Sequence, residues 1–177
     1  MLKQAFLVLC GALFLIGCDD ECINEFGECP DQQLQEDLAL IDEYLTAKGL
    51  EAEVHPSGLH YIILEEGDGE TPNNNQEVVV NYTGRFLDGR VFDTSLDSVA
   101  RAEGIFNENR DYQPFQFTLG IGRVIPGWDI GIGLLNEGAK AQLLLPSYLA
   151  YGPSGSGASI PGNTVLTFEV ELLDIKF

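Results

Sequence analysis

Short stretches of alternating apolar and polar residues fill the last two thirds of the chain, and turn residues separate them. In one of these stretches Phe115, Phe117 and Leu119 alternate with polar residues. This period of two is typical of a strand with one buried face. The pattern predicts strands over residues 59–65, 77–83, 91–93, 115–119 and 164–172, and over the apolar run that ends before Pro146.

A short helix is predicted over Gly127–Leu135, between Pro126 and Gly138. Proline suits the first turn of a helix, and glycine suits its end. Internal glycines cost about 1 kcal/mol each in helix propensity relative to alanine, so this helix needs support from a surrounding sheet. Trp128, the one tryptophan of the chain, lies in its first turn. It is either a core residue or the floor of an apolar pocket.

A second, longer helix is predicted over residues 31–48 and ends at Gly49. Its apolar stripe consists of Leu34, Leu38, Ile41 and Leu45. Gln32, Glu36 and Asp37 are expected on its surface. Such a stripe either docks on the chain's own domain or pairs with a second copy, and we expect docking and a monomer.

The first residues have the pattern of an export signal. Lys3 precedes Ala5–Gly17, an uncharged and mostly apolar run that is too short to span a membrane. The run ends in Leu15-Ile16-Gly17-Cys18, which resembles a bacterial lipobox. This resemblance implies cleavage of a signal peptide over residues 1–17 and lipidation of Cys18 in a spacer over residues 18–30. An ordinary signal peptide cut near Gly17 is the alternative.

Two cysteines remain once Cys10 leaves with the signal and Cys18 carries lipid. In an exported protein we expect Cys22 and Cys29 to form a disulfide. A redox pair or a metal site is the weaker alternative, because the spacing is not C-x-x-C. The acidic residues directly after Cys18 either specify a membrane or form a solvated spacer.

Charge and composition exclude several classes of function. The chain has 28 acidic and 9 basic residues, a net charge of −19, which repels nucleic acid. His55 and His60 are its two histidines and have no third ligand nearby in the sequence, so no metal is expected. No catalytic triad, cysteine nucleophile or phosphate-binding loop is evident, and no cofactor is implied.

Apolar and aromatic residues dominate the positions expected to converge, and one acid, Asp93, lies close to them in sequence. These positions are Tyr82, Phe92, Phe115, Phe117, Val124, Ile125, Trp128, Tyr151, Ile160 and Phe168. Such a set either catalyses nothing or catalyses a reaction that needs no acid, base or metal.

Three segments resemble the FKBP-type peptidyl-prolyl cis-trans isomerases: VIPGWDIGIGLLNEGAKAQLLLPSYLAYG from Val124, VVVNYTGRFLDGRVFDTS from Val78, and IPGNTVLTFEVELL from Ile160. The resemblance implies an α+β fold, in which an antiparallel half-barrel sheet of five or six strands wraps one short helix. An isomerase domain is expected over residues 58–177, after an N-terminal helix and linker over residues 31–57.

The resemblance also implies roles for the converging residues. Trp128 would be the floor under the proline ring, and Tyr82, Phe117 and Phe168 would be the walls. The remaining substrate-binding positions would be Val124, Ile125, Phe92, Phe115 and Ile160, with the Ile125 N–H bonding a substrate carbonyl and Ile160 closing the mouth. Asp93 and Tyr151 would face the substrate backbone, so that Tyr82, Asp93, Tyr151 and Phe168 form the catalytic set.

Departures from the family pattern concern substrate preference and the affinity for macrolide inhibitors. Residues 94–113 resemble an insertion of roughly a dozen residues beside the pocket, which leaves Arg101 and Arg110 as candidates for the base that orients Asp93. Arg123 stands where a glutamate is frequent, and Ser156 and Ser159 replace bulkier residues.

The implied function is that of a foldase, lipid-anchored in the bacterial cell envelope, which isomerises X–Pro bonds of exported proteins. The alternative is a chaperone or peptide-binding module that uses the same groove without catalysis.

Overall fold

The structure is a computed structural model that describes residues 30–176. The predicted signal peptide 1–17, the lipidation site Cys18 and the Cys22–Cys29 disulfide lie outside the described residues. The helices are α1 (Pro30–Lys48), α2 (Asp97–Ala102) and α3 (Pro126–Ile132), with short 3-10 turns η2 (Ser147–Leu149) and η3 (Gly152–Ser154). The strands are β1 (Glu53–Val54), β2 (His60–Glu65), β3 (Glu77–Phe86), β4 (Val91–Thr94), β5 (Phe115–Thr118), β6 (Lys140–Leu145) and β7 (Leu166–Lys176).

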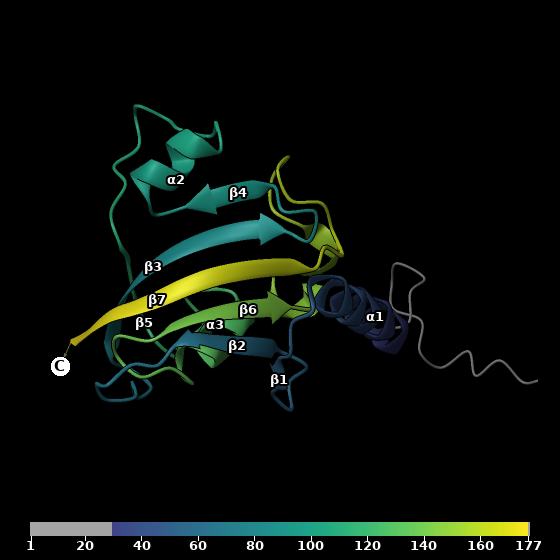
Figure 1. The fold of residues 1–177 in the computed structure, drawn as a ribbon, viewed down its shortest axis with the longest axis horizontal. Coiled ribbons are helices and arrows are strands. Elements are labelled where there is room, and N and C mark those ends of the chain that lie inside the picture. Colours follow the sequence, from purple (N-terminus) through teal and green to yellow (C-terminus); the bar gives the residue numbers. More distant parts are fainter. Residues whose placement is uncertain (1–29, 177) are drawn as a thin grey trace, which may run out of the picture.

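All strand pairs are antiparallel, and the sheet runs in the order β1-β2-β6-β7-β3-β4, with β5 pairing β3 beyond the end of β4 (Figure 1). The predicted sheet around one short helix is confirmed. It has seven strands rather than five or six, because the two-residue β1 forms within the predicted linker and pairs with β2. A turn at Asp88-Gly89 joins β3 to β4, which lies at one edge of the sheet.

The inner face of the sheet packs on α3, and glycines make this contact close. A Cβ atom built on Gly127 would lie 2.3 Å from Leu145 Cδ2, and one on Gly131 would lie 2.6 Å from Leu143 Cδ1. Both leucines are fully buried. The glycines that weaken α3 as an isolated helix therefore let its backbone approach β6.

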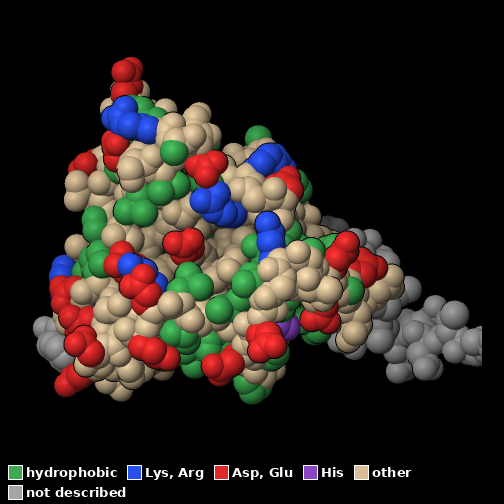
Figure 2. All heavy atoms as spheres, viewed as in Figure 1, with side chains coloured by type: hydrophobic (Ala, Val, Ile, Leu, Met, Phe, Trp, Pro, Cys, Tyr) green, Lys and Arg blue, Asp and Glu red, His purple; other side chains and the backbone are tan. Residues whose placement is uncertain are grey.

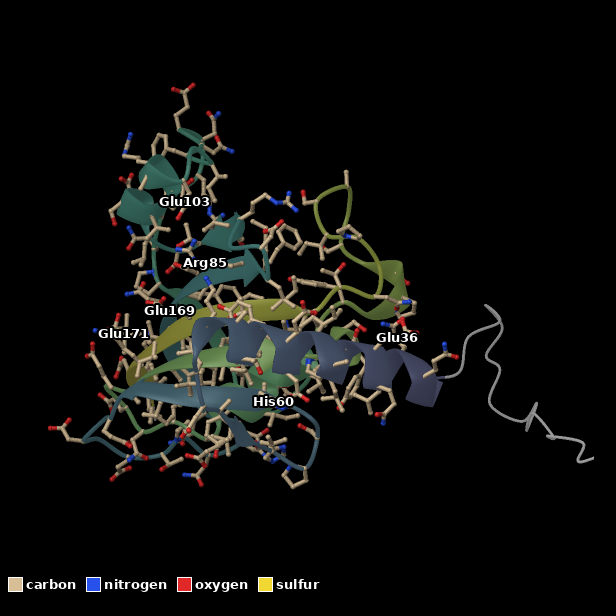
Figure 3. All side chains as sticks on the ribbon, turned by 45° about the vertical axis from the view of Figure 1, so that its right-hand side comes forward. Glu36, His60, Arg85, Glu103, Glu169 and Glu171 are labelled. Atoms are coloured by element: carbon tan, nitrogen blue, oxygen red, sulfur yellow. The ribbon has the colours of Figure 1, made fainter. Side chains whose placement is uncertain are left out.

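The outer face of the same sheet carries α1, which lies in front of the strands in Figure 3. Ile41 and Leu45 of α1 pack in one buried cluster with Leu144 and Val165. The Gln142 amide on β6 donates to the Tyr44 hydroxyl at 3.1 Å. The predicted docking of this helix on its own domain is confirmed, and the monomeric state stays a prediction.

Asp37 was expected on the surface of α1, and this prediction is wrong because its carboxylate is fully buried. Its Oδ2 accepts hydrogen bonds from the Ser147 N–H at 2.7 Å and the Ser147 hydroxyl at 2.6 Å. The Gln33 amide donates to Oδ1 at 2.8 Å. These bonds satisfy the carboxylate and tie α1 to η2.

Other element boundaries shift for local reasons. α3 ends at Ile132, three residues before the predicted end, because tight turns then carry Leu135 into the core. The segment 94–113, which resembles an insertion, begins at the last residue of β4 and contains α2. β7 continues to Lys176. Its pairing with β3 shifts register between Val79 and Val80, so that the buried residue after Leu172 is Ile175.

The exposed side of the sheet is acidic. Figure 2 shows acidic side chains spread over this face, with basic side chains beside several of them.

Among residues 30–176, no helix combines the length and apolarity that a membrane crossing requires.

Candidate functional site

A cavity of about 540 Å³ opens on the inner side of the sheet, at the N-terminal end of α3. Nine of the predicted site residues line it: Tyr82, Phe92, Asp93, Phe115, Val124, Ile125, Trp128, Tyr151 and Phe168. Arg123, Pro126 and Ala150 also line it, and they were not predicted as site residues. Most of this lining is aromatic or aliphatic, so the cavity suits an apolar ring.

Trp128 belongs both to the core and to the cavity wall. It is 5% exposed, and its ring centre lies 5.1 Å from that of Tyr82 and 5.4 Å from that of Phe168, both in edge-to-face geometry. Its Nε1 is buried without a hydrogen-bond partner among the described residues. The two interpretations of Trp128 therefore hold together: the indole is a core side chain with a cavity above it.

A glycine in the middle of β3 makes room for two of the aromatic rings. A Cβ atom on Gly84 would lie 2.5 Å from Phe92 Cζ and 2.9 Å from Phe168 Cε1. The two phenyl rings meet edge to face, 5.6 Å apart. Sequence reasoning missed Gly84 because the predicted strand ended at Thr83, whereas β3 continues to Phe86. A glycine inside a strand often marks a close approach of this kind.

Polar groups meet at the other side of the cavity. The Tyr82 hydroxyl donates to Asp93 Oδ2 at 2.6 Å. The Arg110 guanidinium donates to Asp93 Oδ1, and its Nη2 donates to the Tyr82 hydroxyl at 3.1 Å. A tyrosine, a carboxylate and an arginine thus form a closed triangle, in which the charges of Asp93 and Arg110 balance.

Arg110, not Arg101, is the basic residue that orients Asp93. Arg101 pairs with Asp97 within α2 and stacks over the Phe106 ring at 3.5 Å. Phe106 stacks on Tyr112, and the Arg110 guanidinium lies 5.1 Å from the Tyr112 ring centre. The insertion 94–113 is therefore internally packed, and this packing places Arg110 at the cavity.

Both tyrosines of the cavity are held in the neutral form. Burial, together with the hydrogen bond to Asp93, raises the pKa of Tyr82 to about 12. Burial and then the charge of Asp93 also raise the pKa of Tyr151 above its ordinary value. Neither phenol gives up its proton near neutral pH, so each acts as a hydrogen-bond donor there.

The turn before α3 presents backbone groups to the cavity. The Asp129 carboxylate accepts from the Gly120 N–H at 2.8 Å and the Gly122 N–H at 3.1 Å, which fixes the turn. The Ile125 N–H has no acceptor within the described residues. A free N–H beside an apolar cavity is a ready donor for the carbonyl of a bound peptide.

Two predicted site residues do not line the cavity. Phe117 is buried behind Phe115, with the two ring centres 5.6 Å apart, and it contacts the Trp128 ring at 5.9 Å between centres. Ile160 is 6% exposed and is held in the core beside a bridge to Ser156. Phe117 therefore supports the floor from behind, and Ile160 does not close the mouth in this structure.

The loop that carries Tyr151 depends on α1. Asp37 bonds both the N–H and the hydroxyl of Ser147, four residues before Tyr151. The Tyr148 hydroxyl in the same turn donates to the Ser57 carbonyl. A helix on the outer face of the sheet therefore anchors a loop that reaches the inner face.

The described residues contain no group of three or more potential metal ligands. His60 is buried, and its Nδ1 lies 3.0 Å from the Gly58 carbonyl oxygen. His55 bonds Ser57. The cavity thus combines an apolar floor, neutral hydroxyls, an acid paired with Arg110 and the Arg123 side chain, a set that can bind a peptide bond without transferring protons.

Comparison with protein families gives one match over most of the sheet. A family model described as FKBP-type peptidyl-prolyl cis-trans isomerase matches residues 68–173. The matched range contains every residue that lines the cavity.

Individual relatives differ in how much of their own length is matched. FK506-binding protein of Neisseria meningitidis is 42% identical over 112 residues, which are 63% of this chain and 91% of that protein. FK506-binding protein 4 of Dictyostelium discoideum is 42% identical over 118 residues, 67% of this chain but 28% of that protein. The crystal structure of FkpA from Escherichia coli superposes with a TM-score of 0.62 at 35% identity, covering 82% of this chain and 62% of that one.

Proposed function

Because the chain belongs to the FKBP-type peptidyl-prolyl cis-trans isomerases, we propose that its cavity catalyses rotation about X–Pro bonds in protein segments. The observation that carries the proposal is the cavity over Trp128, which is lined by aromatic rings and whose one acid, Asp93, is paired with Arg110. This lining favours a proline ring over a charged or strongly polar group.

The proposed mechanism uses the difference in charge separation between the planar and the twisted amide. Resonance polarises the planar amide and gives the rotation a barrier of about 18–20 kcal/mol. An apolar cavity disfavours the polarised planar form relative to the twisted form. Binding that fits the twisted form better than the planar one lowers the barrier, and about 7 kcal/mol corresponds to roughly 10⁵-fold in rate.

Named groups would hold the substrate in that form. The proline ring would lie on Trp128, and the Ile125 N–H would donate to a substrate carbonyl. Tyr82 and Asp93 lie across the cavity and would face the carbonyl of the rotating bond. Since the pKa of Tyr82 is about 12, its hydroxyl would keep the proton that it donates to Asp93 and hold that carboxylate in place.

A peptide assay tests the activity. Full-length chain should accelerate cis-to-trans exchange of X–Pro peptides in a protease-coupled assay. We expect Asp93→Val to lower kcat/KM roughly ten- to hundredfold, and Tyr82→Phe about fivefold, because each loses hydrogen bonds inside the cavity. Tyr44→Phe, on the outer face, and Asp88→Val, in an exposed turn, are matched controls that should keep activity.

If the wild-type chain shows no turnover yet suppresses client aggregation, the proposed isomerase activity is wrong. The alternative function, a binding module that uses the same groove, would then be supported. A chain with neither property contradicts both functions.

We further propose that the protein is an exported, lipid-anchored foldase. The support is the lipobox-like Leu15-Ile16-Gly17-Cys18 after an apolar run. Fatty-acid labelling in bacterial cells should mark the wild type and the Cys10→Ser variant, and should fail for Cys18→Ser. Label on the Cys18→Ser variant would contradict lipidation at this position.

The name of the Neisseria relative states that it binds FK506. We propose that the same cavity of this chain binds FK506 and that the ligand competes with X–Pro peptides. Inhibition of turnover by FK506 in the peptide assay is the expected result. Turnover unchanged at saturating FK506 would contradict this proposal and leave the isomerase activity intact.

A further inference from the structure

We propose that Arg123 makes this cavity select X–Pro segments that carry a carboxylate side chain next to the proline. The inference rests on the proposed isomerase function and names the substrate class of the same site. It starts from the pairing of charges over residues 30–176.

Most basic side chains of the described residues are neutralised by a carboxylate. Those within 4 Å of an acidic group are Arg85, Arg90, Arg101, Arg110, Lys140 and Lys176. In residues 30–176, only Lys48 and Arg123 lack such a partner. Lys48 lies on α1, with its Nζ 6.0 Å from the Tyr44 ring centre. Arg123 lines the cavity.

The charge of the cavity is therefore positive although the protein is strongly negative. The charged lining residues are Asp93 and Arg123, and Asp93 is already paired with Arg110. One unpaired guanidinium is left at the edge of a binding site, in a chain of net charge −19. A planar guanidinium binds a carboxylate through two parallel hydrogen bonds.

The backbone that carries Arg123 is fixed in place. Asp129 holds the N–H groups of Gly120 and Gly122, directly before Arg123. Arg123 is followed by Val124 and Ile125, whose side chains line the same cavity. A peptide bound to the Ile125 N–H would therefore pass within reach of the Arg123 side chain, at a residue flanking the proline.

The two charge effects act over different distances. Repulsion between an acidic peptide and the whole chain is a long-range effect, screened beyond about 10 Å at 0.1 M salt. A contact between Arg123 and a carboxylate is local, and exposed pairs of this kind change binding by roughly two- to fivefold. Selection for acidic segments should therefore be small, and it should weaken further at high salt.

The experiment uses the full-length chain and peptides blocked at both ends, so that a side-chain carboxylate is the one acidic group offered. Peptides with Glu, Gln or Lys directly before or directly after proline are compared by exchange NMR, which needs no coupling protease. We expect wild type to favour Glu over Gln by roughly two- to fivefold in kcat/KM at one of the two positions.

Three variants at position 123 should each give a different result. Arg123→Lys should keep the preference for Glu, Arg123→Gln should abolish it, and Arg123→Glu should turn it into a preference for Lys. Lys48→Gln removes the same charge from α1, far from the cavity lining, and should leave the ratio unchanged. Arg123 is exposed and bonds no other described residue, so these variants should fold.

Equal rates for Glu and Gln peptides at both positions with wild type would overturn the inference. A preference that survives in Arg123→Gln, or that disappears in Lys48→Gln, would also overturn it. Turnover of no peptide at all would instead overturn the proposed function, and the selectivity with it.

Discussion

The two helices on opposite faces of the sheet are held by different means. α3, on the inner face, has seven residues, and its glycines bring it into close contact with Leu143 and Leu145 of β6. α1, on the outer face (Figure 3), has 19 residues. Its buried apolar contacts are a few side chains that include Ile41 and Leu45. Neighbouring residues of one strand, Leu143 and Leu144, thus serve two different layers.

The two helices therefore have different roles: α3 positions a residue of the cavity, and α1 stabilises the domain. α3 carries Trp128 into the cavity wall, and its place depends on the absence of side chains at Gly127 and Gly131. α1 adds buried apolar area to the domain but contributes no residue to the cavity lining. Its one link to the site is Asp37, through Ser147.

The largest expected effect is on the outer face. Ile41→Ala should lower the free energy of unfolding by about 2–5 kcal/mol, because it leaves a cavity beneath α1. Its kcat/KM, measured well below the unfolding transition, should match wild type. Leu40→Ala, 46% exposed on the same helix, should change stability by less than about 0.5 kcal/mol. Loss of activity in folded Ile41→Ala would contradict the claim that the outer face affects stability but not activity.

Asp37 is where the two faces are coupled. Asp37→Ala should destabilise the fold by about 1.5–3 kcal/mol, since the buried Ser147 N–H and hydroxyl lose their acceptor. It should also lower kcat/KM, because the Tyr151 loop follows Ser147. The exposed Asp42→Ala is the control for charge on α1. Unchanged kinetics in Asp37→Ala would confine α1 to stability alone.

The inner face is tested by adding atoms rather than removing them. Gly127→Ala should cost about 1–3 kcal/mol of stability, because its Cβ would overlap Leu145, and it should lower activity by displacing Trp128. Gly133→Ala at the end of α3, with its nearest neighbour at 3.2 Å, is the matched control and should cost less. Calorimetry and the peptide assay measure both quantities. Equal losses in the two variants would contradict close packing on β6 as the cause.

The smallest expected effect is that of pH. The pKa of Tyr82 is about 12 in the folded chain against an ordinary value of 10. Its neutral form therefore stabilises the fold fully below pH 10, and this contribution is lost as the pH rises through about 12. Ultraviolet difference spectra of wild type against Tyr82→Phe follow this titration. A phenol titrating near pH 10 would show that Tyr82 is not buried against Asp93.

The sequence predicted the sheet and most of the cavity because both follow from local patterns. Period-two alternation located β3, β5 and β7, and the family-like segments placed Trp128 and Tyr82 correctly. Asp37 could not be predicted, because its partner Ser147 lies 110 residues away and a carboxylate on a helix is usually solvated.

The sequence could not predict whether Arg101 or Arg110 pairs with Asp93, for a similar reason. Both arginines lie in the insertion, and the stacking of Phe106 on Tyr112 decides which one reaches Asp93. The sequence could not show whether Ile160 faces the cavity, because a side chain next to a glycine-rich loop can turn toward either the core or the opening, and in the structure it lies in the core.

The counter-ion of Asp93 comes from the segment between β4 and β5, which forms no strand of the sheet. Replacing this segment by a loop of another composition would change the electrostatics of the cavity, while the strands around Trp128 would keep their hydrogen bonds. The sheet and α3 thus hold the cavity in place, while the segment between β4 and β5 supplies a charge that can change without altering them.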